Sequence, residues 1–307
     1  MNLNKHQVEQ VCKKLNENLI RFSFLAKGNH NSNYLLETTD NKYVIRVEDN
    51  QQFKNLKKEF KFLKLAKPGL GPKVLLFDNS HKIIPRDYLI EEFIDGKHPS
   101  EEHPTNDFVE QMAEWFKKLH KTTKISSKPY LLTTKVKPYY KNYLKYKDNI
   151  EDEEFKEKLS RYISKALKIL KKNNTIFANR KTISLLHNDT SSGNIFYKPG
   201  YVRLIDWEFV DYGLPERELI YFLDSYRLSK NQQNLFLRSY GYPNTKKVNI
   251  QLSMAYIILL FSSIGYSLWQ LDMLQKKKFS KKDKAERIKR LIRDINLLKE
   301  KINGKLI

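Results

Sequence analysis

The 307-residue chain is short of cysteine and of acidic residues, and each shortage narrows what the protein can be. Its one cysteine, Cys12, excludes an intrachain disulfide and a cysteine-based zinc cluster, so a reducing cytoplasm is the expected setting. The N-terminal stretch also lacks the apolar run of a signal peptide. It favours a helix instead, with one apolar side formed by Val8, Val11, Leu15 and Leu19.

The shortage of acid leaves a strongly basic chain. Against 35 Asp plus Glu stand 57 Lys plus Arg, and the formal charge is +22. An excess of this size can attract nucleic acid or an anionic membrane surface. The lysines are widely scattered, with one local cluster at 276–278 and 281–282, and they do not alternate with aromatic residues as RNA-binding segments do. We therefore favour a solvated, lysine-rich surface and expect no nucleic-acid partner.

One segment is long enough to cross a bilayer. Residues 248–271 contain no charged side chain, and 257–261 are strongly apolar. Serine and glutamine residues interrupt the run, which favours a helix buried in a large lobe over a membrane span. We expect no membrane span.

Residues 1–92 are predicted to form a small mixed lobe, an antiparallel sheet of five strands with a helix. The helix runs from about Gln51 to Ala66, with Phe53, Leu56, Phe60 and Leu63 at helical spacing, and Pro68-Gly69 ends it. Asp40-Asn41 forms a turn between two strands. The predicted strands are Ile20–Lys27, Asn33–Thr38, Lys42–Val47, Lys73–Phe77 and Asp87–Glu92.

Residues 93–307 are predicted to form a larger, mainly helical lobe. Helices are expected over 107–121, 135–149 and 152–172, and three or four more after residue 208. The last runs from about Lys282 to Asn303, has an amphipathic stripe and ends at Gly304. The fold class is thus α+β, with two lobes.

The most informative stretch lies between residues 187 and 208. Asp189 and Asn194 lie at the two ends of a tight loop, and the apolar segments 195–197 and 202–205 flank a Pro-Gly turn. A hairpin there would return the chain to its start and bring Asp206 beside Asn194. The general kinase pattern assigns three roles at such spacings: a base that accepts a hydroxyl proton, and two oxygen ligands for Mg²⁺. His187 is more readily explained as a packed, hydrogen-bonded brace for the loop.

The pattern His-Asn-Asp-x-x-x-x-Asn at 187–194, followed by Ile-Asp-Trp-Glu-Phe at 205–209, resembles the aminoglycoside phosphotransferase and choline kinase superfamily. The Asn at 188 and the Glu at 208 are most similar to its choline/ethanolamine kinase branch. The resemblance implies a two-lobed, protein-kinase-like fold that uses ATP and Mg²⁺ to phosphorylate a small-molecule hydroxyl. In it Asp189 is the catalytic base, and Asn194 and Asp206 are the metal ligands.

The same resemblance indicates where ATP would bind. The candidate phosphate loop is 28–33, which includes Ser32 but has one glycine, so an ordinary hairpin turn fits it about equally well. Arg46 stands where kinases carry a phosphate-pairing lysine, and Glu59 is its expected ion-pair partner, although Glu59 also fits a charged surface. Residues 89–96 resemble the hinge between lobes, where the backbones of Glu92 and Ile94 would meet adenine.

The acceptor is expected to carry positive charge. Six acids and one arginine lie between residues 204 and 226, although two of the acids fit helix caps. Glu208 and Glu218 are the candidates for contacting a cation. Tyr266 and Trp269 share one side of the uncharged helix, and the resemblance implies a cation–π pocket there, although both fit a plain core as well.

The sequence leaves three functions open. The first is a kinase of a choline- or ethanolamine-like amino alcohol, and the second is an aminoglycoside or other sugar kinase of the same superfamily. The third is a catalytically silent protein of the same fold that binds nucleotide or nucleic acid, and retention of all three reacting residues disfavours it. The oligomeric state stays open, and a homodimer is compatible with the sequence.

Overall fold

The computed structural model describes residues 2–28, 30–49, 55–277 and 281–304. Asn29 of the candidate phosphate loop, Phe53 of the predicted helix and Lys278 of the lysine cluster lie outside these ranges. The chain divides into two compact units. Unit 1 contains residues 1–122, 184–212 and 225–240, and unit 2 contains residues 123–183, 213–224 and 241–307.

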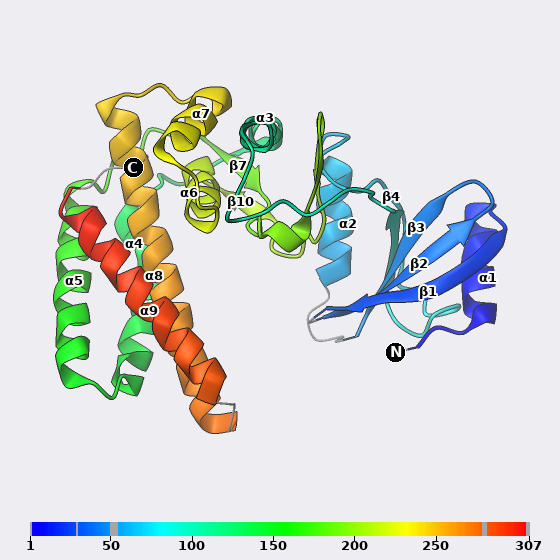
Figure 1. Ribbon diagram of the computed structural model, residues 1–307, viewed down its shortest axis with the longest axis horizontal. Coiled ribbons are helices and arrows are strands. Elements are labelled where there is room, and N and C mark those ends of the chain that lie inside the picture. Colours follow the sequence, from blue (N-terminus) through cyan, green and yellow to red (C-terminus); the bar gives the residue numbers. More distant parts are fainter. Residues whose placement is uncertain (1, 29, 50–54, 278–280, 305–307) are drawn as a thin grey trace. The chain divides into compact units, whose positions relative to one another are not determined.

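A five-stranded antiparallel sheet forms the N-terminal part of unit 1 (Figure 1), and its strands lie in the order β1-β2-β3-β5-β4. Consecutive strands pair directly except where α2 intervenes, because the chain returns from that helix to the edge strand β4 before it enters β5. The strands are β1 (Leu19–Lys27), β2 (Asn31–Thr38), β3 (Lys42–Glu48), β4 (Val74–Asp78) and β5 (Tyr88–Glu92). These are the five strands that the sequence predicts.

Helices α1 (Lys5–Leu15) and α2 (Asn55–Leu65) pack against this sheet. Successive side chains of a strand point to opposite faces. Ile45 of β3 joins the core cluster that contains Val8 and Val11 of α1, while its neighbour Arg46 bonds to Glu59 of α2. The two helices therefore serve opposite faces of β3, one apolar and one ionic.

The predicted apolar side of α1 includes Leu19, which lies beyond the end of the helix. Helix α1 ends at Leu15, and Asn16 adopts a left-handed conformation with φ of 57°. Asparagine tolerates this conformation well and often ends helices. Leu19 consequently lies in β1, where it is half-buried, instead of on the helix.

The rest of unit 1 supports the stretch 187–208. It contains α3 (Asn106–His120), the short turn η2 (Ser192–Asn194), the hairpin strands β8 (Ile195–Lys198) and β9 (Tyr201–Leu204), and α7 (Lys230–Tyr240). Helix α3 packs along α7, and its buried face contains Phe108, Trp115 and Phe116. Short strands β6 (Thr123–Ile125), β7 (Thr182–Leu186) and β10 (Asp211–Gly213) occur where the chain passes between the units.

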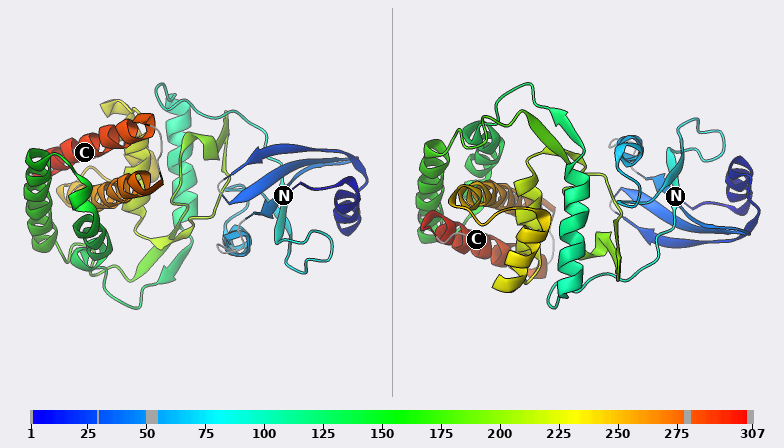
Figure 2. Two further views of the ribbon diagram at one scale, coloured as in Figure 1. Left: turned by 90° about the horizontal axis from the view of Figure 1, so that it is seen from below. Right: turned by 90° about the horizontal axis from the view of Figure 1, so that it is seen from above.

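Unit 2 is helical. Figure 2 shows α8 lying between α4 and α9, and it contacts both, while α5 contacts α4 and α9. At Gly265 of α8 an added Cβ would lie 3.3 Å from the Tyr139 carbonyl oxygen of α4, so the two helices approach closely here and a side chain would require a small shift. The helices are α4 (Leu132–Tyr146), η1 (Lys147–Asn149), α5 (Glu153–Lys172), α6 (Pro215–Ser225), α8 (Lys246–Lys277) and α9 (Lys281–Ile302).

Helix α8 contains the apolar segment that the sequence analysis singled out. Within the described residues, Lys246–Leu274 is long and apolar enough to cross a membrane, and 67% of its most apolar window is buried inside the structure. Core helices of globular proteins meet the same criteria. Length and composition therefore do not assign this helix to a membrane.

An ion pair with a buried carboxylate joins α6 to the segment that precedes β7 in unit 2. Arg180 donates to both carboxylate oxygens of Glu216, and its Nη1 lies 2.7 Å from Oε2. The Tyr242 hydroxyl donates to Glu216 as well, at 2.7 Å, and the guanidinium lies over the Phe177 ring. Glu216 is fully buried. One guanidinium thus meets one carboxylate, with both oxygens bonded.

The five-stranded antiparallel sheet and the mainly helical remainder agree with the predicted α+β class. The predicted helices correspond to α3, to α4 followed by η1, to α5 and to α9, and four helices follow residue 208 in the part of the chain that the structure describes. The functional boundary at residues 92 and 93 stays a prediction, because the compact units group segments that are distant in sequence.

Candidate active site

His187 holds the loop that follows β7. Its ring is fully buried and lies against Trp207, with the ring centroids 4.8 Å apart. Nδ1 accepts a bond from the Asp189 backbone N–H at 3.3 Å, so Nε2 carries the proton and donates to the Ile205 carbonyl at 3.1 Å. His187 is therefore a neutral brace, as the sequence favours.

Asp189 and Asn194 bracket this loop, and they face each other across it. The Asn194 side-chain N–H donates to the Asp189 carbonyl oxygen at 3.3 Å, and the Ser191 backbone N–H donates to Asp189 Oδ1 at 3.3 Å. Oδ2 of Asp189 has no hydrogen-bond partner in the described part of the chain. One carboxylate oxygen is fixed, and the other can accept a proton.

The predicted hairpin is present and closes next to Asn194. Strands β8 and β9 pair from Ile195 with Leu204 to Lys198 with Tyr201. Gly200 in the turn has φ of 76°, a conformation that glycine adopts without strain. At the base, the Ile205 N–H donates to the Asn194 carbonyl oxygen at 2.9 Å, so Asp206 is the next residue along.

The backbone at Asp206 is itself unusual. Asp206 has φ of 63° and Asn188 has φ of 67°, both in the left-handed region that few residues other than glycine enter. Trp207 is fixed immediately afterwards, because its N–H donates to Glu59 at 2.9 Å and its ring leaves no room for a side chain at Gly71. Packing on both sides therefore sets where the Asp206 carboxylate points.

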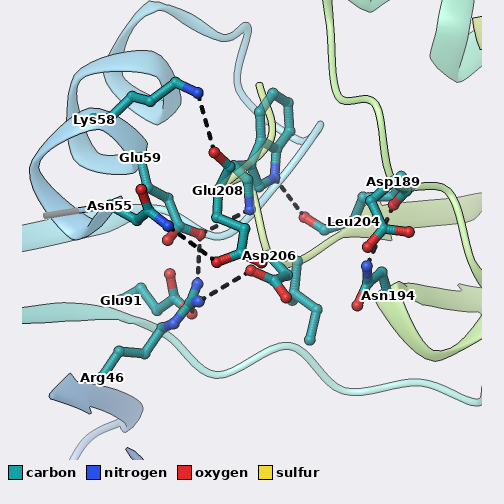
Figure 3. A network of polar contacts seen from close by, with 12 residues as sticks. Arg46, Asn55, Lys58, Glu59, Glu91, Asp189, Asn194, Leu204, Asp206 and Glu208 are labelled. Atoms are coloured by element: carbon teal, nitrogen blue, oxygen red, sulfur yellow. Dashed lines mark hydrogen bonds and ion pairs between the residues drawn. The ribbon is translucent and has the colours of Figure 1, made fainter. Parts of the chain in front are cut away.

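Arg46 is the centre of a cluster of three carboxylates (Figure 3). Its guanidinium donates to Glu59, lies 3.2 Å from Asp206 Oδ1, and has Nη1 3.9 Å from Glu91 Oε1. The side chains of Arg46, Glu59 and Glu91 are buried, whereas that of Asp206 is 35% exposed. The expected Arg46–Glu59 pair is present, and the alternative of an exposed Glu59 is not. The cluster holds more negative than positive charge.

This surplus of carboxylates shifts protonation. Burial raises the pKa of Glu91 to about 8, because the opposing effect of Arg46 is incomplete and Glu59 and Asp206 add to the rise. Burial also raises the pKa of Glu59. Burial alone would lower the pKa of Arg46, but the carboxylates outweigh it and keep the guanidinium charged. Bound protons therefore offset part of the carboxylate charge, in addition to Arg46.

Glu208 lies on the same side of unit 1 as this cluster, two residues after Asp206. Its carboxylate accepts a bond from the Asn55 side chain at 3.4 Å, and its carbonyl oxygen accepts one from Lys58 at 3.1 Å (Figure 3). The side chain is 8% exposed. Burial, and then the charge of Asp206, raise the pKa of Glu208.

Two cavities meet at Asn33, Arg46 and Asp206. The first is polar, about 220 Å³ in volume, and is lined by Lys27, Gly28, His30, Asn31, Asn33, Arg46, Asp206 and Glu208. The second is mainly apolar and about 200 Å³ in volume. It is lined by Leu25, Ala26, Asn33, Val44, Arg46, Glu91, Glu92, Phe93, Ile94, Phe196, Ile205 and Asp206. A polar compartment beside an apolar one suits a phosphate chain and a flat base.

The candidate phosphate loop contributes to the polar cavity through its amide side chains. Asn31 and Asn33 line it, whereas Ser32 lies between them on β2, is 2% exposed and donates its hydroxyl to Asp49 at 2.6 Å. Alternation along a strand explains why the two amides share a face and the serine does not. The role of Ser32 in ATP binding stays a prediction.

The hinge residues Glu92 and Ile94 both line the apolar cavity. The Glu92 N–H donates to the Lys73 carbonyl oxygen at 2.9 Å, and the Glu92 carboxylate pairs with Arg203 at 2.7 Å. The Ile94 N–H makes no hydrogen bond to the residues that the structure describes. It is a backbone donor at the cavity wall.

The other acceptor candidates lie in unit 2. Tyr266 and Trp269 of α8 are 47% and 37% exposed, and their ring centroids are 5.5 Å apart, so they form an exposed aromatic pair and not part of a closed core. Glu218 of α6 is buried, with an exposed fraction of 1%. Asp189 belongs to unit 1, and a role of these residues in binding the acceptor stays a prediction.

The donor set fits Mg²⁺ better than a transition metal. No group of three or more His, Cys, Asp or Glu side chains that could hold a metal occurs within the described ranges. Mg²⁺ is commonly held by one or two carboxylates together with phosphate oxygens and water. Asp206, with one carboxylate oxygen bonded to Arg46 and the other without a partner in those ranges, and the amide oxygen of Asn194 fit that pattern.

Comparisons with known proteins give the fold and the family. The fold is kinase-like and is shared with phosphotransferases of known structure. The model of the phosphotransferase enzyme family matches residues 21–249, so the chain belongs to that family. A search of curated protein sequences found no match.

Solved structures of two kinds resemble the chain. A protein from Ralstonia eutropha JMP134 assigned to the aminoglycoside phosphotransferases has a TM-score of 0.73 and 14% identity, with 100% of both chains covered. The choline kinase of Streptococcus pneumoniae has a TM-score of 0.62 and 17% identity, with 94% of this chain and 97% of that chain covered. Spectinomycin phosphotransferase, solved with ADP and spectinomycin, has a TM-score of 0.63 and 14% identity, with 98% of this chain and 99% of that one covered.

The sequence places Asn31 and Asn33 in the candidate phosphate loop without singling either out, and it gives Glu91 no role. All three line the cavities, and Glu91 also belongs to the Arg46 cluster. Period-two alternation could have found them, because Asn31 and Asn33 are two residues apart on one strand, and Glu91 follows the apolar run of β5. A charged residue at the end of a buried strand is a signal that a pattern search can use.

Proposed function

We propose that this phosphotransferase moves the γ-phosphoryl group of ATP to a hydroxyl of a small cationic molecule, an amino alcohol of the choline or ethanolamine kind. One observation carries the proposal. The loop with the open carboxylate oxygen of Asp189 closes, through the Asn194–Ile205 bond, directly beside the Asp206–Arg46 cluster and its cavities. A base and a phosphate-binding region are thereby adjacent, as phosphoryl transfer requires.

Asp189 is proposed as the base. The acceptor hydroxyl oxygen attacks the γ-phosphorus, the bond from that phosphorus to the bridging β-oxygen breaks, and ADP leaves with the bonding electrons. The hydroxyl proton passes to Asp189 Oδ2, while Oδ1 is held by the Ser191 N–H. The His187 bond to the Asp189 N–H keeps the loop in this orientation.

The remaining residues bind and orient ATP. Asp206 and Asn194 are proposed to hold Mg²⁺, which when bound neutralises charge on the phosphates. Arg46 is proposed to bind phosphate oxygens, and Glu59 to hold Arg46 in place. Ser32 and its loop are proposed to contribute to the same ATP site. The backbones of Glu92 and Ile94 are proposed to face adenine. A cytoplasmic location is part of the same proposal, resting on the single cysteine.

The exposed pair Tyr266 and Trp269 supports a cationic acceptor. Aromatic faces attract an ammonium group, and Tyr and Trp do so better than Phe or aliphatic residues. Glu208 and Glu218 are proposed to add negative charge for the same acceptor. The similarity to aminoglycoside phosphotransferases supports a second candidate, an aminoglycoside or other sugar kinase, because those acceptors are hydroxylated and cationic too.

An acceptor screen tests the proposal. Purified protein with ATP and Mg²⁺ is offered choline, ethanolamine, aminoglycosides and neutral sugars, and ADP release and phosphorylated product are both measured. We expect turnover on an amino alcohol, with Asp189→Asn slower by about 10²- to 10⁴-fold. Asp40→Asn, the same change in an exposed turn, is the control and should match the wild type.

The outcomes separate the parts of the proposal. Preference for aminoglycosides moves the assignment to the second candidate. Preference for neutral sugars overturns the cation argument, and near-normal turnover in Asp189→Asn overturns the role of Asp189. Nucleotide binding without turnover on any acceptor would favour a silent member of the fold.

A further inference from the structure

Glu91 is a buried acid to which the proposed reaction gives no task. It lies on β5 opposite Val44 of β3, is 3% exposed, and lines the apolar cavity. Most of that cavity wall is aliphatic or aromatic. An acid in such a wall costs folding free energy unless it is paired, so its presence there needs an explanation.

The two oxygens of Glu91 have different surroundings. Oε1 lies 3.9 Å from Arg46 Nη1, beyond hydrogen-bond distance. Oε2 is buried and has no hydrogen-bond partner among the described residues. A carboxyl placed only to hold Arg46 would be expected to bond to it as closely as Glu59 does. Glu91, which lines the apolar cavity, therefore keeps a carboxyl oxygen that no donor in the described residues uses.

The same wall carries a backbone donor, the Ile94 N–H. A flat base between the apolar side chains would thus meet a donor and, at Glu91, an acceptor. The edge of adenine presents an acceptor nitrogen next to an amino group that donates, whereas guanine presents an oxo group, which accepts, next to an N–H. The wall matches adenine and opposes guanine.

We propose that Glu91 selects the nucleobase, its carboxyl oxygen accepting a hydrogen bond from the 6-amino group of adenine and repelling the 6-oxo group of guanine. The inference rests on the proposed use of a nucleoside triphosphate. It makes Glu91 a specificity-determining residue, distinct from the residues that position the phosphates.

The charged groups that face Glu91 give the selection a pH dependence. They are Arg46 on β3, Glu59 on α2 and Asp206 after β9, and with burial they raise the pKa of Glu91 to about 8. A protonated carboxyl has an O–H that can donate to the 6-oxo group of guanine, while the ionised form only accepts. Preference for adenine should therefore increase as pH rises through about 8.

The test compares three nucleotides that differ at position 6: ATP, GTP and purine riboside triphosphate, which has hydrogen there. Binding is measured by calorimetry and kcat/KM by product formation, for wild type, Glu91→Gln and Glu91→Leu. Above about pH 8, where Glu91 is ionised, the wild type should favour ATP over the purine analogue by about 10- to 100-fold, the range of one hydrogen bond to a charged group. This ligand comparison requires no variant to fold.

In the variants the ratios are decisive. Glu91→Leu should bring the ratio of ATP to purine analogue close to one. Glu91→Gln, whose amide can both donate and accept, should lower the ratio of ATP to GTP by about 10-fold and remove its dependence on pH. Glu37→Gln makes the same change on β2 away from both cavities and should keep the wild-type ratios.

Other outcomes overturn the inference. If the Glu91 variants weaken all three nucleotides equally, Glu91 only supports Arg46, and the selection is refuted. If ATP is transferred with unchanged ratios in both variants, the selection fails while the proposed function stands. If the ratios depend on Glu91 in binding but no acceptor is phosphorylated, the selection stands and the proposed function fails.

Discussion

Two arginines in this protein pair with buried glutamates but have opposite surroundings. Arg180 in unit 2 meets one carboxylate, Glu216, and bonds to both of its oxygens. Arg46 in unit 1 faces three carboxylates, and only Glu59 is bonded closely, while Glu91 and Asp206 lie farther away. The first cluster is balanced in charge and complete in hydrogen bonds. The second has surplus acid and opens onto two cavities.

The difference separates an ion pair that holds the fold from one suited to binding. A balanced pair has little capacity for further ligands, because each oxygen already has a donor. Surplus carboxylates beside a guanidinium can bind cations and protons on one side and phosphate on the other. Buried charge alone does not indicate a site, but unbalanced buried charge next to a cavity marks a candidate site.

The largest effect is expected at Arg46. Arg46→Met removes the group proposed to grip the phosphates, so kcat/KM for ATP should fall on the order of 10³-fold. Thermal melting should show that the variant is still folded, because Glu91 and Glu59 can take up protons when the guanidinium is gone. A loss below 10-fold, measured at saturating acceptor, would show that the cluster is structural like the one in unit 2.

Arg180→Met should lower the stability of the protein and leave its kinetics with ATP unchanged, the reverse of what is expected at Arg46. Among the described residues it leaves the fully buried Glu216 with only the Tyr242 hydroxyl, and the free energy of unfolding should fall by about 3 kcal/mol. The folded fraction should keep the wild-type KM for ATP. Urea unfolding followed by kinetics at low temperature checks both. A changed KM with unchanged stability would remove the contrast between the two arginines.

The smallest effect concerns pH and Glu91. Its pKa is raised in the folded state, so its contribution to stability is complete below the ordinary pKa of a glutamate and is lost as pH rises to about 8. Replacing it with glutamine removes this loss. The stability of Glu91→Gln relative to wild type should therefore increase as pH rises from about 5 to about 8.

Glu37→Gln is the matched control for this measurement. Hydrogen bonds from Arg21 and Lys42 lower the pKa of Glu37 to about 2, so its contribution is complete above the ordinary pKa and is lost only in acid. Urea midpoints of this variant should run parallel to wild type between about pH 5 and about pH 8. If the urea midpoints of Glu91→Gln also run parallel to wild type, Glu91 is ionised in the folded protein across this whole pH range.

Much of the fold could be predicted because its signals are local. Alternating apolar residues mark the strands of the sheet, and the Pro-Gly turn marks the hairpin of β8 and β9. Strand order could not be predicted, because the placement of β5 between β3 and β4 depends on contacts far apart in sequence. The strand β7 was also missed, since five residues before the loop carry little periodicity.

The site was predictable where spacing along one segment sets the geometry. Asp189, Asn194 and Asp206 lie within one loop and hairpin, so turn chemistry alone brings their backbones together. Glu91 could not be found in this way, and the two asparagines of β2 could be assigned only to a loop and not to a cavity. Their importance comes from burial and from facing Arg46 across the sheet, which are properties of the folded chain.

The hairpin that joins Asn194 to Asp206 also determines where this chain can change length. Its tip at Pro199-Gly200 is separated from its base by four residue pairs. Residues inserted at the tip would extend the ribbon and leave the base where it is, so peptides or labels can be grafted there. One residue inserted within either strand would exchange its two faces and turn the base away. Tolerance and intolerance to insertion thus lie a few residues apart.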